Sequence, residues 1–223
     1  MLPPRRSGTP GCPAGAGQDR ATGPVGFDLD LTLIDSRSAI MAAWSAVVLE
    51  TGVEIDLVAV ERRLGVKLED EIPFWFPATL VEPVAAIYRR HYIRVAASLT
   101  TALPGARESL AAVREFGGTP VVVTAKHPVS VGPSMMAAGL TVQEIFTHVY
   151  GPEKAAVLAR IRAAVYVGDT PQDMIAGRSA GAHAVGVPTG SFARAELLAA
   201  GAHAVLGSLQ EFPAWYAAFR RAR

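Results

Sequence analysis

Residues 24–30 read Pro24-Val25-Gly26-Phe27-Asp28-Leu29-Asp30, a short apolar run that ends in two acids. The apolar part has the length and composition of a buried β-strand. In an open parallel sheet, ligands bind beyond the carboxyl ends of the strands. Asp28 and Asp30 therefore mark a candidate site, provided that further strands surround this one.

Downstream of Pro104-Gly105, helical patterns alternate with short apolar runs. This alternation predicts an α/β fold, a doubly wound parallel sheet with helices on both faces. The expected strands cover residues 120–124, 145–150, 164–167, 183–187 and 204–206. The expected helices cover residues 106–116, 129–138, 153–162, 171–180, 193–200 and 208–221.

Residues 36–100 interrupt this alternation after the first strand, since they contain helical patterns and no convincing strand. Ser36 is placed to cap a first helix, and Thr51-Gly52 to end it. We therefore expect an inserted α-helical cap domain at 36–100. The core then consists of residues 23–35 and 101–223.

Composition limits the partners of the chain. The 223 residues fit one domain with a smaller insertion, and a net charge of +1 gives no reason to expect nucleic acid or an anionic membrane. No apolar run approaches the ~18 residues that span a bilayer. The single cysteine, Cys12, leaves no intramolecular disulfide. A cytoplasmic location is expected by default.

Residues 1–22 differ from the rest of the chain. Proline and glycine dominate them, and large apolar residues are almost absent. Such a segment buries too little surface to offset its ordering entropy. We expect a disordered N-terminal extension.

Polar residues follow three of the expected strands, and four of them are acids. These residues are Asp28 and Asp30, Thr124 and Lys126, and Asp169 and Asp173. Carboxylates brought together at one sheet edge repel each other unless a cation intervenes. Ligands that are all oxygen, with no nearby histidine or cysteine, favour Mg²⁺ over zinc.

Magnesium with carboxylates and a lysine suits phosphoryl transfer, where catalysis is mostly positioning and charge neutralisation. An aspartate can attack phosphorus and form an aspartyl-phosphate. A second acid can protonate the leaving alkoxide and then activate water. Asp28 and Asp30 have the spacing to share these roles, and Thr124 and Lys154 could hold the phosphoryl oxygens.

The chain resembles the haloacid dehalogenase-like hydrolases in four motifs that occur in order. The first is an Asp-x-Asp-x-Thr stretch that closes the first strand, the second an apolar strand ending in Ser or Thr, the third a lysine, and the fourth a Gly-Asp stretch with a further Asp. In this sequence they are Phe27–Leu33, Val121–Thr124, Lys154 and Val167–Met174, continued by residues 176–181.

The resemblance implies a role for each matching residue. Asp28 is the nucleophile and a metal ligand, and Asp30 is the general acid and base, with its backbone carbonyl also on Mg²⁺. Thr124 and Lys154 bind the phosphoryl group, and Lys154 also offsets the charge of Asp28. The remaining acids belong to the metal shell, Asp169 as a ligand and Asp173 as an orienting group.

The cap resembles that of the phosphoglycolate phosphatase-like branch. Leu64–Leu68 is similar to the substrate-specificity loop of that branch, where Lys67 could face an anionic leaving group. Thr124-Ala125-Lys126 resembles a Thr-Asn-Lys variant of the second motif, so Ala125 and Lys126 are further substrate-binding candidates. The usual glycine after the second aspartate is Leu31 here, which suggests a slightly different loop.

The expected function is magnesium-dependent hydrolysis of a small phosphorylated metabolite through an aspartyl-phosphate. Phosphoglycolate is the first substrate to test. A phosphomutase on the same fold and a non-catalytic binding module remain open, whereas dehalogenases of the superfamily lack the acid at Asp30. The oligomeric state is left open.

Overall fold

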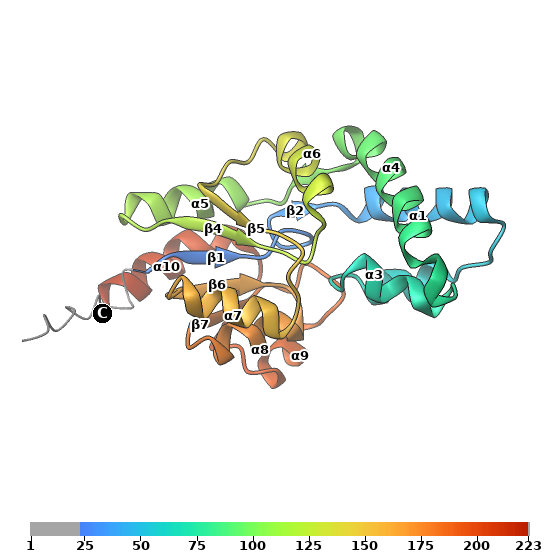
Figure 1. The fold of residues 1–223 in the computed structure, drawn as a ribbon. Helices are drawn as coiled ribbons and strands as arrows, with labels where there is room; N and C mark the ends of the chain where they lie inside the picture. Colours follow the sequence, from blue (N-terminus) through green and yellow to red (C-terminus); the bar gives the residue numbers. More distant parts are fainter. Residues whose placement is uncertain (1–22, 223) are drawn as a thin grey trace, which may run out of the picture.

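The computed structural model describes residues 23–222, so the expectations for residues 1–22 lie outside the described part of the chain. A six-stranded sheet runs through the middle of the molecule, in the order β5-β4-β1-β6-β7-β8, and every neighbouring pair is parallel (Figure 1). The predicted α/β parallel sheet is therefore confirmed. Its strands are β1 (Val25–Phe27), β4 (Pro120–Val123), β5 (Glu144–Phe146), β6 (Val165–Gly168), β7 (His183–Gly186) and β8 (Ala204–Val205).

Strand β1 occupies the point where the strand order reverses. Val25 pairs with Pro120 of β4 on one side and with Val165 of β6 on the other. The crevice between neighbouring strands opens at such a point, beyond the carboxyl ends. The chain thereby places Asp28, which follows β1 directly, at the mouth of this crevice.

Helices cover both faces of the sheet. One face packs on α5 (Ala106–Glu115), α6 (Pro128–Ala138) and α10 (Phe212–Arg221), through a core that includes Phe27, Val122 and Leu110. The other packs on α7 (Pro152–Arg160), α8 (Pro171–Ser179) and α9 (Arg194–Ala199). Because the central strands are buried on both faces, their sequences are almost continuously apolar.

Residues 37–99 form a separate group of helices at one end of the sheet (Figure 1). The group consists of α1 (Arg37–Thr51), α2 (Leu57–Arg62), α3 (Leu68–Glu71) and α4 (Val81–Leu99), with the 3-10 turns η2 (Ile72–Phe74) and η3 (Ala78–Leu80). It has its own apolar core, in which Trp44, Tyr88 and Tyr92 are buried. We call this group the cap. It also touches the core, because α4 packs on α6 as well as on α1.

Two short strands connect the cap to the core. Strand β2 (Ile34–Asp35) enters the cap and β3 (Thr101–Ala102) leaves it, and the two pair antiparallel with Ile34 opposite Ala102. The sequence did not predict this ribbon, because two residues are too few to show the alternation of a strand.

Two expected elements differ in extent from the observed ones. The strand expected at 145–150 is β5, which ends at Phe146, and the chain then turns through His148 with a positive φ of 58°. The C-terminal helix expected at 208–221 begins as a 3-10 turn, η4 (Leu209–Glu211), before α10.

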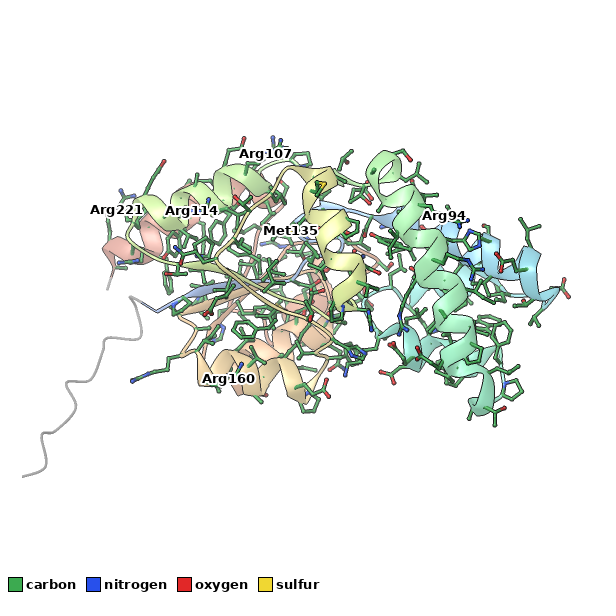
Figure 2. All side chains as sticks on the ribbon, turned by 45° about the horizontal axis from the view of Figure 1, so that its top comes forward. Arg94, Arg107, Arg114, Met135, Arg160 and Arg221 are labelled. Atoms are coloured by element: carbon green, nitrogen blue, oxygen red, sulfur yellow. The ribbon has the colours of Figure 1, made fainter. Side chains whose placement is uncertain are left out.

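Arginine side chains are spread over the molecule rather than gathered on one face. Figure 2 labels Arg94 on α4, Arg107 and Arg114 on α5, Arg160 on α7 and Arg221 at the end of α10. Arg107 and Arg114 donate to the backbone carbonyls of Ala138 and Thr141.

Among residues 23–222, no helix has the length and apolar character needed to cross a membrane.

Candidate active site

A cleft lies between the carboxyl ends of β1 and β4 and the cap. The core contributes Asp28, Asp30 and residues 124–127 and 130 to its lining, and the cap contributes residues of α1 to α4 and of the loop at 63–66. The predicted residues Thr124, Ala125 and Lys126 are thus brought together with the first two acids.

Asp28 is buried at the end of β1, with its backbone N–H donating to the carbonyl of Val167 at 2.8 Å. The Lys154 Nζ donates to Asp28 Oδ1 at 2.7 Å. Burial raises the pKa of Asp28 to about 7, although Lys154 acts in the opposite direction. A carboxylate that is poorly solvated but held by one cation is a plausible nucleophile.

Lys154 is buried in the first turn of α7, where the sequence placed it. Its Nζ bridges Asp28 and Asp173, at 2.7 Å from an oxygen of each. Burial acts to lower the pKa of Lys154, but the charges of Asp173 and Asp28 outweigh it and raise the pKa well above its usual value. The side chain therefore carries a permanent positive charge at the floor of the site.

Asp173 is fully buried, and both of its carboxylate oxygens accept two hydrogen bonds from the chain. Oδ1 accepts from Lys154 Nζ and from the Tyr166 hydroxyl at 3.0 Å. Oδ2 accepts from Thr170, from the backbone N–H at 3.1 Å and from Oγ1 at 2.7 Å. A direct bond from Asp173 to a metal ion would displace one of these partners, since each oxygen has two lone pairs.

Asp169 follows β6 and lies beside Asp28 and Asp173, with one carboxylate oxygen of each residue within 4.8 Å of the others. Thr32 Oγ1 donates to Asp169 Oδ1 at 2.9 Å. Oδ2 lies against Gly190, where an added Cβ would be 1.9 Å away. Burial and the charges of Asp173 and Asp28 raise the pKa of Asp169 well above its usual value. This crowding of buried carboxylates fits a hard divalent cation.

Asp30 lies at the edge of the cleft, partly exposed. Its Oδ1 accepts from Ser36 Oγ at 2.5 Å and from Lys126 Nζ at 2.7 Å. Ser36 is the residue before α1, as predicted, but its hydroxyl makes no capping hydrogen bond. The side chain expected to cap a helix thus binds an acid of the site instead.

Lys67, by contrast, is not among the residues that line the cleft. Its Nζ pairs with Glu153 Oε2 of α7 at 2.5 Å. The loop before it does contact the core, because Gly65 lies so close to Thr170 that an added Cβ would be 2.9 Å from Thr170 Cγ2. The loop resembling a specificity loop therefore faces the site through Leu64, Gly65 and Val66 rather than through its lysine.

Several residues of the site were given no role by the sequence. Thr32 and Tyr166 support Asp169 and Asp173, and Arg63 and Arg89 line the cap side of the cleft. Thr32 is part of the Asp-x-Asp-x-Thr stretch, which could have suggested it. The others carry no local signal, because only the folded chain brings them to the cleft.

Known proteins resemble this chain both in sequence and in fold. A sequence profile of haloacid dehalogenase-like hydrolases matches residues 25–178, and a second, HAD-hydrolase-like, profile matches residues 145–212. The probable phosphatase IndB of Dickeya dadantii (strain 3937) is 28% identical in an alignment of 213 positions, and the match covers 83% of this chain and 89% of that protein.

Solved structures share the fold at lower identity. A putative β-phosphoglucomutase from Bacteroides vulgatus superposes with a TM-score of 0.74 at 19% identity, covering 92% of this chain and 91% of that one. A predicted phosphoglycolate phosphatase from Haemophilus somnus 129PT gives 0.71 at 18%, covering 87% and 97%.

Proposed function

The chain belongs to the haloacid dehalogenase-like hydrolase family, and on that premise we propose that it is a magnesium-dependent phosphatase of small phosphate monoesters. One observation carries the proposal. Asp28 and Asp169 are buried side by side with raised pKa values, and a buried lysine holds the first of them in place. The similarity to a probable phosphatase supports the same reaction class.

In the first step, an oxygen of Asp28 attacks phosphorus. A new bond forms between that oxygen and phosphorus, and the bond from phosphorus to the leaving oxygen breaks. Asp30 donates its proton to that oxygen, so that a neutral alcohol leaves. Lys154 and Thr124 bind the oxygens of the phosphoryl group during transfer.

In the second step, water hydrolyses the aspartyl-phosphate. Asp30, now ionised, takes a proton from water as the water oxygen bonds to phosphorus, and the bond to Asp28 breaks to release phosphate. Lys126 and Ser36 keep the Asp30 carboxylate at the cleft edge through both steps, since both bond to it.

Magnesium fits the oxygen-only donor set of this site, where Asp28, Asp169 and the backbone carbonyl of Asp30 would hold it. When bound, it neutralises the charge of the phosphoryl group and of the two acids. Asp173 was expected in the metal shell, but its oxygens are already occupied by Lys154, Tyr166 and Thr170, so we assign it the positioning of Lys154.

The replacement Asp28→Asn tests the proposal. We expect kcat for a monoester such as p-nitrophenyl phosphate to fall at least about 10³-fold, because an amide cannot act as the nucleophile. Rapid acid quenching should trap a phosphoenzyme in the wild type and none in the variant. The matched control is Asp35→Asn, an exposed acid outside the cleft, which should retain activity. A fully active D28N enzyme would eliminate the mechanism.

A phosphomutase is the second function to distinguish, because one of the superposed structures is described as a β-phosphoglucomutase. A mutase returns the phosphoryl group to a second hydroxyl, whereas a phosphatase gives it to water. Measuring inorganic phosphate released per mole of sugar phosphate consumed separates the two. We expect complete release.

A further inference from the structure

The cap side of the cleft contains two arginines, and each guanidinium is already ion-paired with a carboxylate of the cap. Arg63 donates to both oxygens of Glu71, from Nε at 2.9 Å and from a terminal nitrogen at 2.6 Å. The guanidinium also lies over the rings of Phe74 and Trp75, with its carbon 4.5 and 5.5 Å from their centroids. Glu71 is itself buried, whereas the Arg63 side chain is 33% exposed at the cleft, so the arginine faces the cleft with its charge already paired.

Arg89 is occupied in the same way. Its two terminal nitrogens pair with Glu69 and, at 2.9 Å, with Glu82. Its third donor, Nε, has no partner among residues 23–222 but is sealed from solvent. A ligand anion would reach Arg89 only by displacing a carboxylate that already neutralises it.

The cations from the core side add no surplus charge. Lys126 is buried between Asp30, at 2.7 Å, and the ring of Tyr92, whose centroid lies 4.1 Å from Nζ. Burial and the charge of Arg89 lower the pKa of His127, so this ring is neutral near pH 7. Arg63 and Arg89 therefore each already have a carboxylate, and Lys126 is paired with Asp30 except while Asp30 carries the proton for the leaving group.

The remaining wall is apolar and aromatic. Trp44, Tyr88 and Tyr92 form a row, with ring centroids 5.4 Å apart for the first pair and 6.0 Å for the second. Ile40, Val60 and Leu64 complete this side of the cleft. The Tyr88 hydroxyl has no hydrogen-bond partner among residues 23–222, which leaves one donor for an uncharged oxygen of a ligand.

From this charge balance we propose that the leaving group of the substrate is uncharged. The inference rests on the proposed phosphatase function and narrows its substrate class. An uncharged group fits beside this wall, because Trp44 and Tyr92 are almost fully buried and offer no charge to a ligand. A carboxylate there would lie beside Glu69 and Glu71 without a free cation, and a buried unpaired charge is strongly unfavourable. Phosphoglycolate, the first expectation from the sequence, carries such a carboxylate.

Two substrates that differ in one group test this. Benzyl phosphate and 4-carboxybenzyl phosphate have the same ring and nearly the same reacting oxygen, but only the second bears a carboxylate. We expect kcat/KM for benzyl phosphate to be at least about tenfold higher, because the carboxylate of the second substrate would lie beside like charges in the cleft. Phosphoglycolate should also be the poorer substrate.

The replacement Glu69→Gln should shift this preference. It removes the main partner of Arg89, so a ligand carboxylate can take its place, and the ratio of the two kcat/KM values should fall at least about threefold. Glu82→Gln, at an exposed partner of the same arginine, should shift the ratio in the same direction by less. Glu108→Gln, an exposed acid on α5 outside the cleft, is the control and should leave the ratio unchanged.

The outcomes separate this inference from the proposed function. Equal or better turnover of 4-carboxybenzyl phosphate or phosphoglycolate by the wild type overturns the inference alone. An unchanged ratio in both E69Q and E82Q, with the variants folded by thermal melting, also overturns it. If p-nitrophenyl phosphate is not hydrolysed in a magnesium-dependent manner either, the phosphatase function itself is wrong.

Discussion

Leu31 holds a backbone conformation that leucine rarely adopts. Its φ is +59°, its N–H donates to the Ile34 carbonyl at 2.8 Å, and its carbonyl accepts from Thr189 Oγ1. The sequence suggested that a leucine in place of glycine would change this loop. In this loop Leu31 adopts the left-handed conformation that glycine favours, and its side chain is buried.

Two replacements at this position should reverse the usual ranking of alanine and glycine. Both lose the buried leucine side chain, but only alanine retains the strain of a positive φ. We expect Leu31→Gly to be more stable than Leu31→Ala by about 1 kcal/mol. Urea unfolding of the two variants measures the difference, and a more stable alanine variant would contradict the assigned conformation.

If magnesium binds at the crowded carboxylates, as we propose, it should stabilise the folded protein. Mg²⁺ at a hundredfold excess over its Kd should add about 2.7 kcal/mol to the free energy of unfolding, a rise in Tm of about 5–10 °C. Asp169→Asn should abolish most of this rise, and its Tm without magnesium should be at least that of the wild type. Thermal melting with and without the ion checks both, and an undiminished response in D169N would remove Asp169 from the metal site.

The stabilisation of the protein by magnesium should also depend on pH, because Asp28 titrates with a raised pKa. The folded-state pKa of Asp28 is raised from 3.8 to about 7, so the folded protein binds more protons than the unfolded chain between these values. In the absence of metal, the stability that the raised pKa of Asp28 contributes is fully present below pH 3.8. It is lost as the pH rises through 7. The rise in Tm caused by Mg²⁺ should therefore be larger at pH 8 than at pH 6, and melts at the two pH values test this.

At the scale of elements, the start of helix α8 is joined to the proposed catalytic site through one residue, Asp173. Thr170 and Asp173 form a reciprocal capping box at its start, and Asp173 also holds Lys154. The helix terminus and Lys154, which we propose binds the phosphoryl group, thus share one carboxylate.

Thr170→Ala should therefore have two effects. Loss of the cap should lower the free energy of unfolding by about 1 kcal/mol. Loss of the hydrogen bond to Asp173 Oδ2 should also lower kcat, because Lys154 is less well held. Thr170→Ser keeps the hydroxyl and should keep both properties. Steady-state kinetics and urea unfolding measure them, and an unchanged kcat in T170A would refute the positioning role of Asp173.

Some strands of the fold could be predicted from the sequence, whereas the ion pairs of the cap could not. The strands at residues 120–124, 164–167 and 183–187 were predictable because both of their faces are buried and their sequences are almost continuously apolar. Thr124 and Asp169, at the ends of two of these strands, followed from the same pattern. The pairing of Arg63 with Glu71 was not predictable, since charges eight residues apart are paired only by the turn between α2 and α3.

At the scale of the whole molecule, the cap and the core contact each other at more places than the two strands that join them. Helix α4 packs on α6, and a buried hydrogen bond of 2.9 Å links the Tyr92 hydroxyl to Ser134 Oγ. Loop contacts at Gly65 and Lys67 lie on the other side of the cleft. The cap is thus attached on both sides of the site.

We therefore expect cap and core to unfold together. Two of the three tryptophans, Trp44 and Trp75, are in the cap, and Trp215 is in α10 of the core. In a Trp215→Phe variant, fluorescence follows the cap alone, while far-UV circular dichroism follows the whole chain. The two melting curves should coincide, and an earlier fluorescence transition would show that the cap melts independently.

The pairing of β2 with β3 has a consequence for how this enzyme can be altered. Because Ile34 and Ala102 lie opposite each other, the two points where the core chain is interrupted are neighbours. A foreign helical segment whose ends are equally close could be grafted between them without stretching the core. Chimaeras of this kind would exchange the leaving-group preference of one enzyme for that of another and keep the same reacting carboxylates.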